Sequence, residues 1–245
     1  MEIKAIKTKI FRGNEDLLEF VLKYVKKIPE KSVLVVTSKI VALSEGRTVE
    51  YKNERQKVAL IKAESEFAFK TKIVWMTVKD GMVMANAGID ESNAKGKLIL
   101  LPKNSFQSAE MLRKKIIQKF HLKNFGVLIT DSRLMPLRSG VVGVALGYAG
   151  FQGLKSYIGK PDIFGRFLKM SKTDVADSLA TGAVLCMGEG KERQPLALID
   201  EAPVFFTDKV KHDELIVDPK KDIYAPLFSN NKMIKYKKYG KKHRK

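Results

Sequence analysis

Apolar residues recur along the chain at two different spacings, and each spacing predicts a different kind of element. Residues 2–11 alternate polar and apolar side chains with a period of two, which is typical of a half-buried strand. Four aliphatic side chains then share one stripe at helical spacing, namely Leu17, Val21, Leu22 and Val25. They predict a helix over residues 15–27 that is capped by Asn14. The apolar run of residues 32–36 predicts a strand that is buried on both faces.

The middle of the chain predicts a helix, a hairpin and a further strand. The helix is expected over residues 53–62, with Asn53 at its start. Residues 72–78 and 82–88 are rich in β-forming side chains and flank an Asp-Gly pair, which favours a tight hairpin turn between them. The short apolar run of residues 97–101 predicts another strand.

The remaining elements complete a mixed pattern. An amphipathic helix is expected over residues 108–120 and a buried strand over 126–130. Thr173 is expected to cap a helix over residues 174–187, and residues 195–199 predict the next strand. Strands and helices follow one another irregularly, so the sequence favours an α+β fold over a strictly alternating βαβ arrangement.

Composition narrows the class of protein. At 44% apolar and 30% charged residues, the 245-residue chain is expected to form a packed core. Its longest nearly unbroken apolar stretch, residues 140–151, is far shorter than the ~18–20 residues that a membrane helix needs. Residues 1–10 lack the continuous apolar centre of a secretory signal. Cys186 is the single cysteine and cannot form an internal disulfide. We therefore expect a soluble, cytoplasmic protein.

Positive charge is concentrated at the end of the chain. The sequence holds 46 Lys and Arg against 27 Asp and Glu, a formal charge of +19. Residues 232–245 contain eight of these cations and no acid, which leaves +11 on the first 231 residues. Such a run favours a solvated, disordered tail, but it could also bind phosphates, with Tyr236 and Tyr239 as stacking faces. We expect one domain over residues 1–231, with room for two subdomains, followed by this tail.

Oxygen-bearing side chains follow predicted elements in three places. These residues are Asp90, Ser92 and Asn93 after the hairpin, Asp131 and Ser132 after a buried strand, and Glu189 between two glycines after a helix. Carboxylates and hydroxyls are the ligands that Mg²⁺ and Mn²⁺ prefer, and such ions usually accompany phosphates. Each position also has a structural alternative, since Asp often caps turns and Gly188 could simply end a helix. Neither a Walker-type loop nor a G-x-G-x-x-G motif after a strand is present.

Four segments in a fixed order give the chain a family resemblance. They are NAGIDESN (86–93), ITDSRLMPLRSGVVGVALGYAGF (129–151), YIGKPDIFGR (157–166) and DVADSLATGAVLCMGEG (174–190). Together they resemble the gamma-glutamyl ligases of the coenzyme F-420 pathway (the CofE family), which add L-glutamate through its amine to a carboxylate of F-420-0. The resemblance runs roughly from Ile3 to Ile199. The second segment is most similar to a bacterial branch described as folate-metabolism gamma-glutamate ligases.

The resemblance implies a fold, two metal ions and a set of site residues. It implies an intertwined homodimer of mixed α and β structure that uses GTP as its usual phosphate donor. The residues implied to hold two divalent ions, Mg²⁺ or Mn²⁺, are Asp90, Asp131, Ser132 and Glu189. The residues implied to contact the nucleotide lie in segments 8–11, 38–39 and 188–194 and at one further position, and they include Ile10, Phe11, Ser38, Lys39, Asn93, Gly188, Gly190 and Gln194.

Two departures from the family pattern leave the substrates open. Leu43 stands where the family often has a lysine near the nucleotide, so ATP is an alternative to GTP. Residues 133–135 read Arg-Leu-Met where the F-420 enzymes commonly have N-G-R or F-G-R. The acceptor could therefore be F-420-0, a folate or another acid.

The chemistry of amide formation agrees with these residue types. A carboxylate must be activated before an amine can attack it, usually by phosphoryl transfer that gives an acyl phosphate, and two divalent ions neutralise the phosphate charge. Arg138 or Arg166 could hold a carboxylate or phosphate through a bidentate contact, or could equally form a structural ion pair. The alternative function is a basic module that binds RNA or phosphate on the same scaffold without ligase activity.

Overall fold

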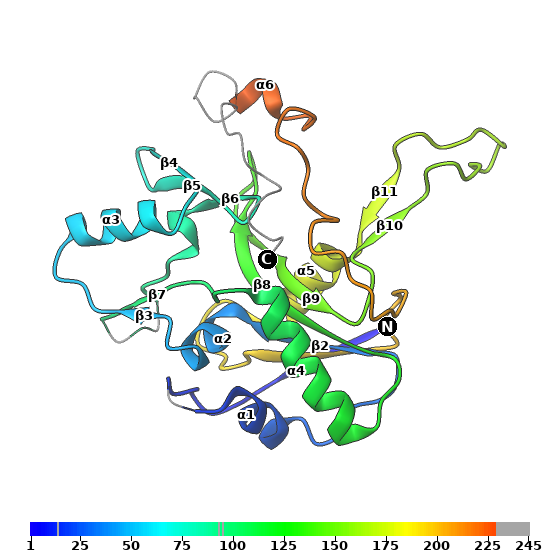
Figure 1. The fold of residues 1–245 in the computed structure, drawn as a ribbon, viewed down its shortest axis with the longest axis horizontal. Helices are drawn as coiled ribbons and strands as arrows, with labels where there is room; N and C mark the ends of the chain where they lie inside the picture. Colours follow the sequence, from blue (N-terminus) through cyan, green and yellow to red (C-terminus); the bar gives the residue numbers. More distant parts are fainter. Residues whose placement is uncertain (14, 93, 95, 229–245) are drawn as a thin grey trace. The chain divides into compact units, whose positions relative to one another are not determined.

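The chain folds into two compact units, shown in a computed structural model that describes residues 1–13, 15–92, 94 and 96–228 (Figure 1). The first unit comprises Met1–Thr48 and Ile99–Glu214, and the second comprises Val49–Leu98 and the described residues from Leu215 onward. Both contain helices and strands, which confirms the mixed α and β class. The basic segment 232–245 and the proposed cap Asn14 lie outside the described residues, and the domain boundary at 231 stays a prediction.

A five-stranded mixed sheet forms the centre of the first unit. Its strands, in spatial order, are β1 (Glu2–Ile6), β12 (Leu196–Asp200), β2 (Ser32–Thr37), β8 (Phe125–Leu134) and β9 (Val141–Ala149). Strands β2 and β8 run parallel, and the other neighbours run antiparallel. The four residues 33–36 of the central strand β2 are completely buried, as the continuous apolar run of the sequence predicts.

Four helices belong to the described part of this unit. They are α1 (Leu17–Tyr24), α2 (Ser38–Ser44), α4 (Ser105–Phe120) and α5 (Val175–Met187). Helix α4 packs against β8 and β9 from one face of the sheet, and α5 packs against β1, β8, β9 and β12 from the other (Figure 1). A short pair of strands, β10 (Leu154–Ser156) and β11 (Lys172–Asp174), carries the arm formed by residues 157–171.

A bulge in β9 lets both helices approach the same strand. Ile129 of β8 pairs with Gly147 and Thr130 pairs with Ala145, so Leu146 is an extra residue in β9. An extra residue reverses the alternation of side chains along a strand. Gly143 therefore faces α5, and Gly147 faces α4. A Cβ atom at either glycine would lie within 2.5 Å of helix backbone, 2.3 Å for Gly143 and 2.4 Å for Gly147.

The second unit is built on a small antiparallel sheet. Its elements are α3 (Glu54–Ala63), β4 (Phe67–Lys70), β5 (Trp75–Lys79), β6 (Met82–Ala85), the 3-10 turn η1 (Asn86–Gly88) and α6 (Ala225–Phe228). The predicted hairpin is confirmed, because Asp80 and Gly81 form the turn between β5 and β6 with positive φ angles of 49° and 81°. Asn53 caps α3 as expected, since its side chain accepts the N–H of Gln56 at 3.0 Å. Two short strands, β3 (Thr48–Val49) and β7 (Leu98–Ile99), pair with each other.

Element ends differ from the sequence predictions in several places. Helix α1 starts later than expected and is capped by Asp16, whose carboxylate accepts the N–H of Glu19 at 2.8 Å. Helix α4 starts earlier, because Asn104 caps it, while Ser108 donates its hydroxyl hydrogen to Glu45 at 2.7 Å. The cap of α5 is Asp174 instead of Thr173. In α4 and α5 the capping side chains, Asn104 and Asp174, accept the free N–H groups of the first turn, which the predicted residues Ser108 and Thr173 do not.

Two further differences affect the site. The first strand ends at Ile6, so residues 8–11 continue as irregular chain. Strand β8 does not end at Thr130 but continues to Leu134, which places Asp131 and Ser132 within the strand. Helix α2 was not predicted, because seven residues that follow a buried strand directly carry little periodicity of their own. Among the described residues, no helix is long and apolar enough to cross a membrane.

Candidate active site

Asp131 lies beside Ser38 because two parallel strands end in register. Thr37 of β2 pairs with Thr130 of β8, so the next residues of the two chains are neighbours. Ser38 is almost fully buried at the start of α2, and its hydroxyl donates to Oδ1 of Asp131 at 3.2 Å. The register of the sheet therefore joins a residue of the proposed nucleotide site to a residue of the proposed metal site.

Ser132 points to the opposite side of β8 and meets Glu189. Successive strand residues point to alternate faces, and Ser132 pairs with Gly143, which faces helix α5. Helix α5 ends at Met187, Gly188 turns the chain with a φ of 79°, and Glu189 comes next. The Ser132 hydroxyl donates to Oε1 of Glu189 at 2.5 Å. Two of the three oxygen-bearing segments thus meet, although 57 residues separate them.

Arg133 is a site residue that the sequence analysis did not identify. Its side chain is buried, and Nη1 forms an ion pair with Oδ2 of Asp131. The signal was present, because residues two apart on a strand share a face, so an arginine at this spacing from an aspartate can pair with it. The pair holds the Asp131 carboxylate from one side while Ser38 holds it from the other.

Three of the proposed nucleotide segments come together at the edge of the sheet. The backbone N–H of Thr8 donates to the carbonyl of Arg193 at 2.8 Å, which joins segments 8–11 and 188–194. The N–H of Thr37, directly before Ser38 and Lys39, donates to the carbonyl of Pro195 at 3.0 Å. These contacts bring the three segments together.

The individual side chains of these segments differ in accessibility. Ile10 is largely exposed, whereas Phe11 is buried and packs edge-on against Phe20 with ring centres 4.9 Å apart. The side chain of Phe11 therefore belongs to the core, so a nucleotide contact from it would come from the backbone. Gln194 and Lys39 are partly exposed. Asn93 lies outside the described residues.

The glycine loop after α5 already holds a carboxylate. Oε2 of Glu192 accepts the backbone N–H of Gly190 at 2.8 Å, and a Cβ on Gly188 would lie 2.7 Å from Cδ of Glu192. Glycines allow a negatively charged group to approach the backbone closely. The loop can therefore receive an anionic group at this N–H, and Glu192 is the group that takes that position here.

Asp90 belongs to the second unit, and its convergence with Asp131 stays a prediction. Its two carboxylate oxygens accept the backbone N–H of Ser92 at 2.6 Å and the Ser92 hydroxyl at 2.9 Å. The neighbouring Glu91 forms an ion pair with Lys57 and accepts the Tyr51 hydroxyl at 3.1 Å. The Lys57 ammonium, above all through its hydrogen bond, holds the pKa of Glu91 below its usual range.

The donor chemistry fits a divalent ion, although a complete cluster is not formed. Asp131, Ser132 and Glu189 offer the hard oxygen atoms that Mg²⁺ and Mn²⁺ prefer. Within the part of the chain that the structure describes, no three His, Cys, Asp or Glu side chains gather closely enough to hold a metal ion. The first unit thus supplies two oxygen pairs, and any further carboxylate would have to come from elsewhere.

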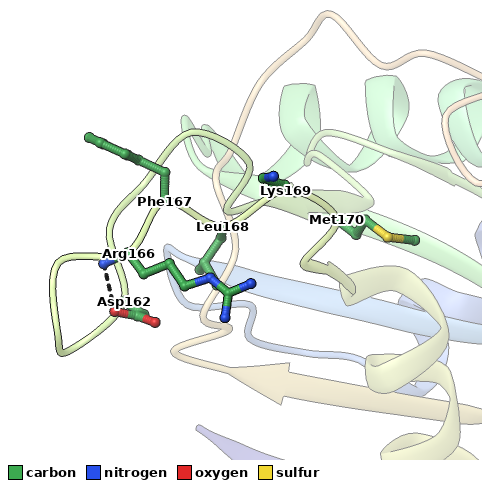
Figure 2. A pocket seen from close by; sticks show the side chains of 6 residues that line it. All are labelled: Asp162, Arg166, Phe167, Leu168, Lys169 and Met170. Carbon is green, nitrogen blue, oxygen red and sulfur yellow. Dashed lines mark hydrogen bonds between the residues drawn. The ribbon is translucent and has the colours of Figure 1, made fainter.

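The two candidate arginines lie on exposed loops. Arg138 is in the turn between β8 and β9, where its backbone N–H donates to the carbonyl of Met135 at 3.2 Å. Arg166 is in the arm, where its backbone N–H donates to Oδ1 of Asp162 at 2.9 Å. A pocket in this arm is lined by six residues, whose side chains Figure 2 shows: Asp162, Arg166, Phe167, Leu168, Lys169 and Met170. A catalytic role for Arg138 stays a prediction.

Comparison with known proteins identifies the family. The family model described as F420-0:Gamma-glutamyl ligase matches residues 5–201. Coenzyme F420:L-glutamate ligase of Methanococcus maripaludis strain C7 is 35% identical over 244 residues, which cover 91% of this chain and 97% of the relative. The enzyme of the same name from Methanocaldococcus jannaschii is 33% identical over 91% of this chain and 96% of its own length. The relative from Archaeoglobus fulgidus is 33% identical over 78% and 83%, respectively. The chain therefore belongs to the F420-0:gamma-glutamyl ligase family.

Proposed function

We propose that the protein is a nucleotide-dependent ligase that adds L-glutamate, through its amine, to a carboxylate of a coenzyme F-420-type acceptor. Family membership and relatives named as glutamate ligases support the reaction class. The observation that carries the proposal is the presence of two oxygen pairs at adjacent positions of β8, Ser38 with Asp131 and Ser132 with Glu189, the second of which lies next to the glycine loop. Oxygen ligands beside backbone amides that accept an anion suit a reaction in which a phosphoryl group is transferred.

The proposed reaction has two balanced steps. First, an oxygen of the acceptor carboxylate attacks the terminal phosphorus of the nucleoside triphosphate, which gives an acyl phosphate and a nucleoside diphosphate. The glutamate amine then attacks the acyl carbon, the carbon–oxygen bond to phosphate breaks, and the amine loses a proton as inorganic phosphate leaves. The two divalent ions, Mg²⁺ or Mn²⁺, supply neutralisation of the phosphate charge when bound.

The chain's own residues divide the work in this proposal. Asp131, Ser132 and Glu189, together with Asp90, hold the ions, while Ser38 and Arg133 keep the Asp131 carboxylate oriented. The backbone N–H of Gly190 donates to a phosphate oxygen, which takes the place of the Glu192 carboxylate. 

Arg138 is proposed to bind the carboxylate of the acceptor or of glutamate through its planar guanidinium group. Its position on an exposed turn leaves it accessible to a substrate.

We propose a preferred and an alternative substrate for both the nucleotide and the acceptor. GTP and F-420-0 come first, because the family resemblance implies GTP and because the relatives are named for coenzyme F420. ATP remains the alternative nucleotide because of Leu43, and a folate the alternative acceptor because of residues 133–135.

Mass spectrometry of reaction mixtures tests this proposal. F-420-0 and tetrahydrofolate are each incubated with L-glutamate, Mg²⁺ or Mn²⁺, and either GTP or ATP. We expect the mass of one added glutamate on one acceptor, with phosphate release only when glutamate and that acceptor are both present. Asp131→Asn is expected to abolish turnover, because it removes a charged oxygen ligand. Unchanged turnover in this variant would contradict the proposed metal site.

We further propose that two copies form a homodimer through the arm of residues 157–171. Three of its large apolar side chains are strongly exposed, with Ile163 at 91%, Phe164 at 90% and Phe167 at 66%. Apolar side chains that gather on the surface often mark an interface, and the resemblance implies a dimer. Light scattering is expected to give twice the chain mass, and a Phe164→Ser, Phe167→Ser variant is expected to give the mass of one chain.

Net charge favours a second candidate function, namely binding of RNA or of phosphate-rich ligands. The charge of +19 would attract polyanions. Thermal shift separates the two functions: stabilisation by GTP or ATP with metal, but not by RNA, supports the ligase. Salt-sensitive RNA binding that is lost on deletion of residues 232–245, without nucleotide hydrolysis, would support the alternative.

A further inference from the structure

Two residues before Asp90, the chain completes a turn whose backbone conformation residues with a Cβ rarely adopt. Asn86, Ala87 and Gly88 have φ angles of 51°, 55° and 70°, so three successive residues lie in the left-handed region. Asparagine and glycine tolerate this conformation, but it costs an alanine roughly 1–2 kcal/mol. Such a conformation persists only where the surrounding structure holds it. The contacts that hold this turn therefore also fix the chain that leads to Asp90.

Strand β5 supplies two of these contacts. Thr77 is completely buried, and its hydroxyl donates to the carbonyl of Met84 at 2.7 Å and accepts the backbone N–H of Ala87 at 2.9 Å. The side-chain oxygen of Asn86 accepts the N–H of Trp75 at 3.0 Å. A hydroxyl that donates in one direction and accepts in the other ties the end of β6 to the left-handed turn.

We infer that Thr77 is a positioning residue for the metal ligand Asp90, acting through the left-handed turn at Asn86–Gly88. The inference rests on the proposed function, in which Asp90 binds a divalent ion. Ile89 alone separates the turn from Asp90, so a change in the turn moves the Asp90 backbone directly. Residues that support a metal ligand from behind typically change metal affinity about 10–100-fold when they are replaced.

Titration of the full chain with Mn²⁺, followed by the electron paramagnetic resonance signal of the free ion, tests the inference. Thr77→Val keeps the size of the side chain but removes both hydrogen bonds, and we expect Mn²⁺ binding about 10-fold weaker or more. Thr77→Ser keeps the hydroxyl and is expected to bind Mn²⁺ like the wild type.

Thr71 offers a matched control in the same unit. Its hydroxyl also donates to one backbone carbonyl and accepts a backbone N–H, both of Val74, at 2.7 and 3.0 Å, but in the turn between β4 and β5. Thr71→Val should lower thermal stability as Thr77→Val does and leave Mn²⁺ binding unchanged. If Thr71→Val weakens Mn²⁺ binding as much as Thr77→Val does, the inference is overturned, because general destabilisation would then explain both effects.

Asp90→Asn separates the failure of this inference from the failure of the metal site. If Asp90→Asn loses Mn²⁺ binding while Thr77→Val keeps it, the inference is wrong and the metal site stands. If wild-type protein takes up no Mn²⁺, or Asp90→Asn binds it equally well, the metal site is wrong and the inference falls with it. Should Thr77→Val not fold, Asn86→Gly removes the bond to Trp75 at a residue type that tolerates positive φ. Weaker Mn²⁺ binding is expected there too, and wild-type binding would overturn the inference.

Discussion

Replacing Gly143 by alanine tests how closely helix α5 lies on the sheet. The added Cβ would be 2.3 Å from the carbonyl oxygen of Ala180 and 2.7 Å from a methyl group of Val184, whereas Cβ contacts below 3.0 Å essentially never occur. Gly143 is not in the left-handed region, so the effect of alanine is steric alone. The clashing atom of Ala180 is a backbone atom of α5, so the whole helix would have to move by roughly 1 Å to restore ordinary contact.

The expected loss of stability follows from two effects. Overpacking of this kind costs about 1–3 kcal/mol. Movement of the helix also breaks the hydrogen bond in which the Thr181 hydroxyl donates to the Gly143 carbonyl at 2.7 Å, worth about 1 kcal/mol. Together, Gly143→Ala should lower the free energy of unfolding in urea by about 2–4 kcal/mol. Glu189 follows the same helix, so ligase activity should fall as well.

Gly182→Ala is the matched control on the same helix. Its Cβ would lie 3.0 Å from Cδ1 of Ile3, the end of a flexible side chain that can move aside. Alanine also favours the helix by up to about 1 kcal/mol relative to glycine. We expect unchanged or slightly higher stability and unchanged activity. If the Gly143→Ala variant is as stable as the wild-type protein, the close packing of α5 on β9 is refuted.

Three further substitutions test single contacts of the first unit. Burial raises the pKa of Asp174 from its usual 3.8 to about 6, so the folded state binds more protons than the unfolded state between these values, and the free energy of unfolding falls as pH rises through them. Asp174→Asn should reduce this fall in urea unfolding measured from pH 4 to 7; an unchanged pH profile would contradict it. Glu192→Gln should lower the KM of the nucleotide about five-fold, because a hydrogen bond about 1 kcal/mol weaker then competes for Gly190, and an unchanged KM would exclude that competition. Arg133→Met should lower the free energy of unfolding by about 3 kcal/mol, the low end for a buried ion pair because the Asp131 side chain is 26% exposed, and a neutral effect would show that the ion pair does not stabilise the fold.

Local sequence signals predicted most elements but not their ends. The buried run of β2, the Asp-Gly hairpin and the Asn53 cap depend on a few neighbouring residues, and all three are confirmed. The starts of α4 and α5 were misplaced, although their last residues, Phe120 and Met187, are as predicted, because several polar residues within four positions can each act as a cap and only the folded backbone decides between them. The strand through Asp131 was predicted too short, because its polar half is stabilised by pairing with β9 and not by its own composition.

The meeting of distant residues could not be predicted from spacing. Ser38 and Asp131 are neighbours only because β2 and β8 pair in parallel with Thr37 opposite Thr130, and this register is not visible in either segment alone. The family resemblance did name both residues, but it gave no contact between them. Arg133 shows the reverse case, since its spacing from Asp131 was readable and only the strand assignment was missing.

The extra residue in β9 connects the fold to the chemistry. In a regular strand without the bulge, Gly143 and Gly147 are four residues apart and would face the same side of the sheet, so one of the two helices would meet a strand whose side chains keep it at a distance. With the bulge, Gly143 faces α5, and the helix approaches closely enough for its C-terminal end to bring Glu189 to Ser132. The distance between these two oxygens therefore depends on strand register and on a missing Cβ, so a substitution at Gly143, which makes neither hydrogen bond of the site, should still change it.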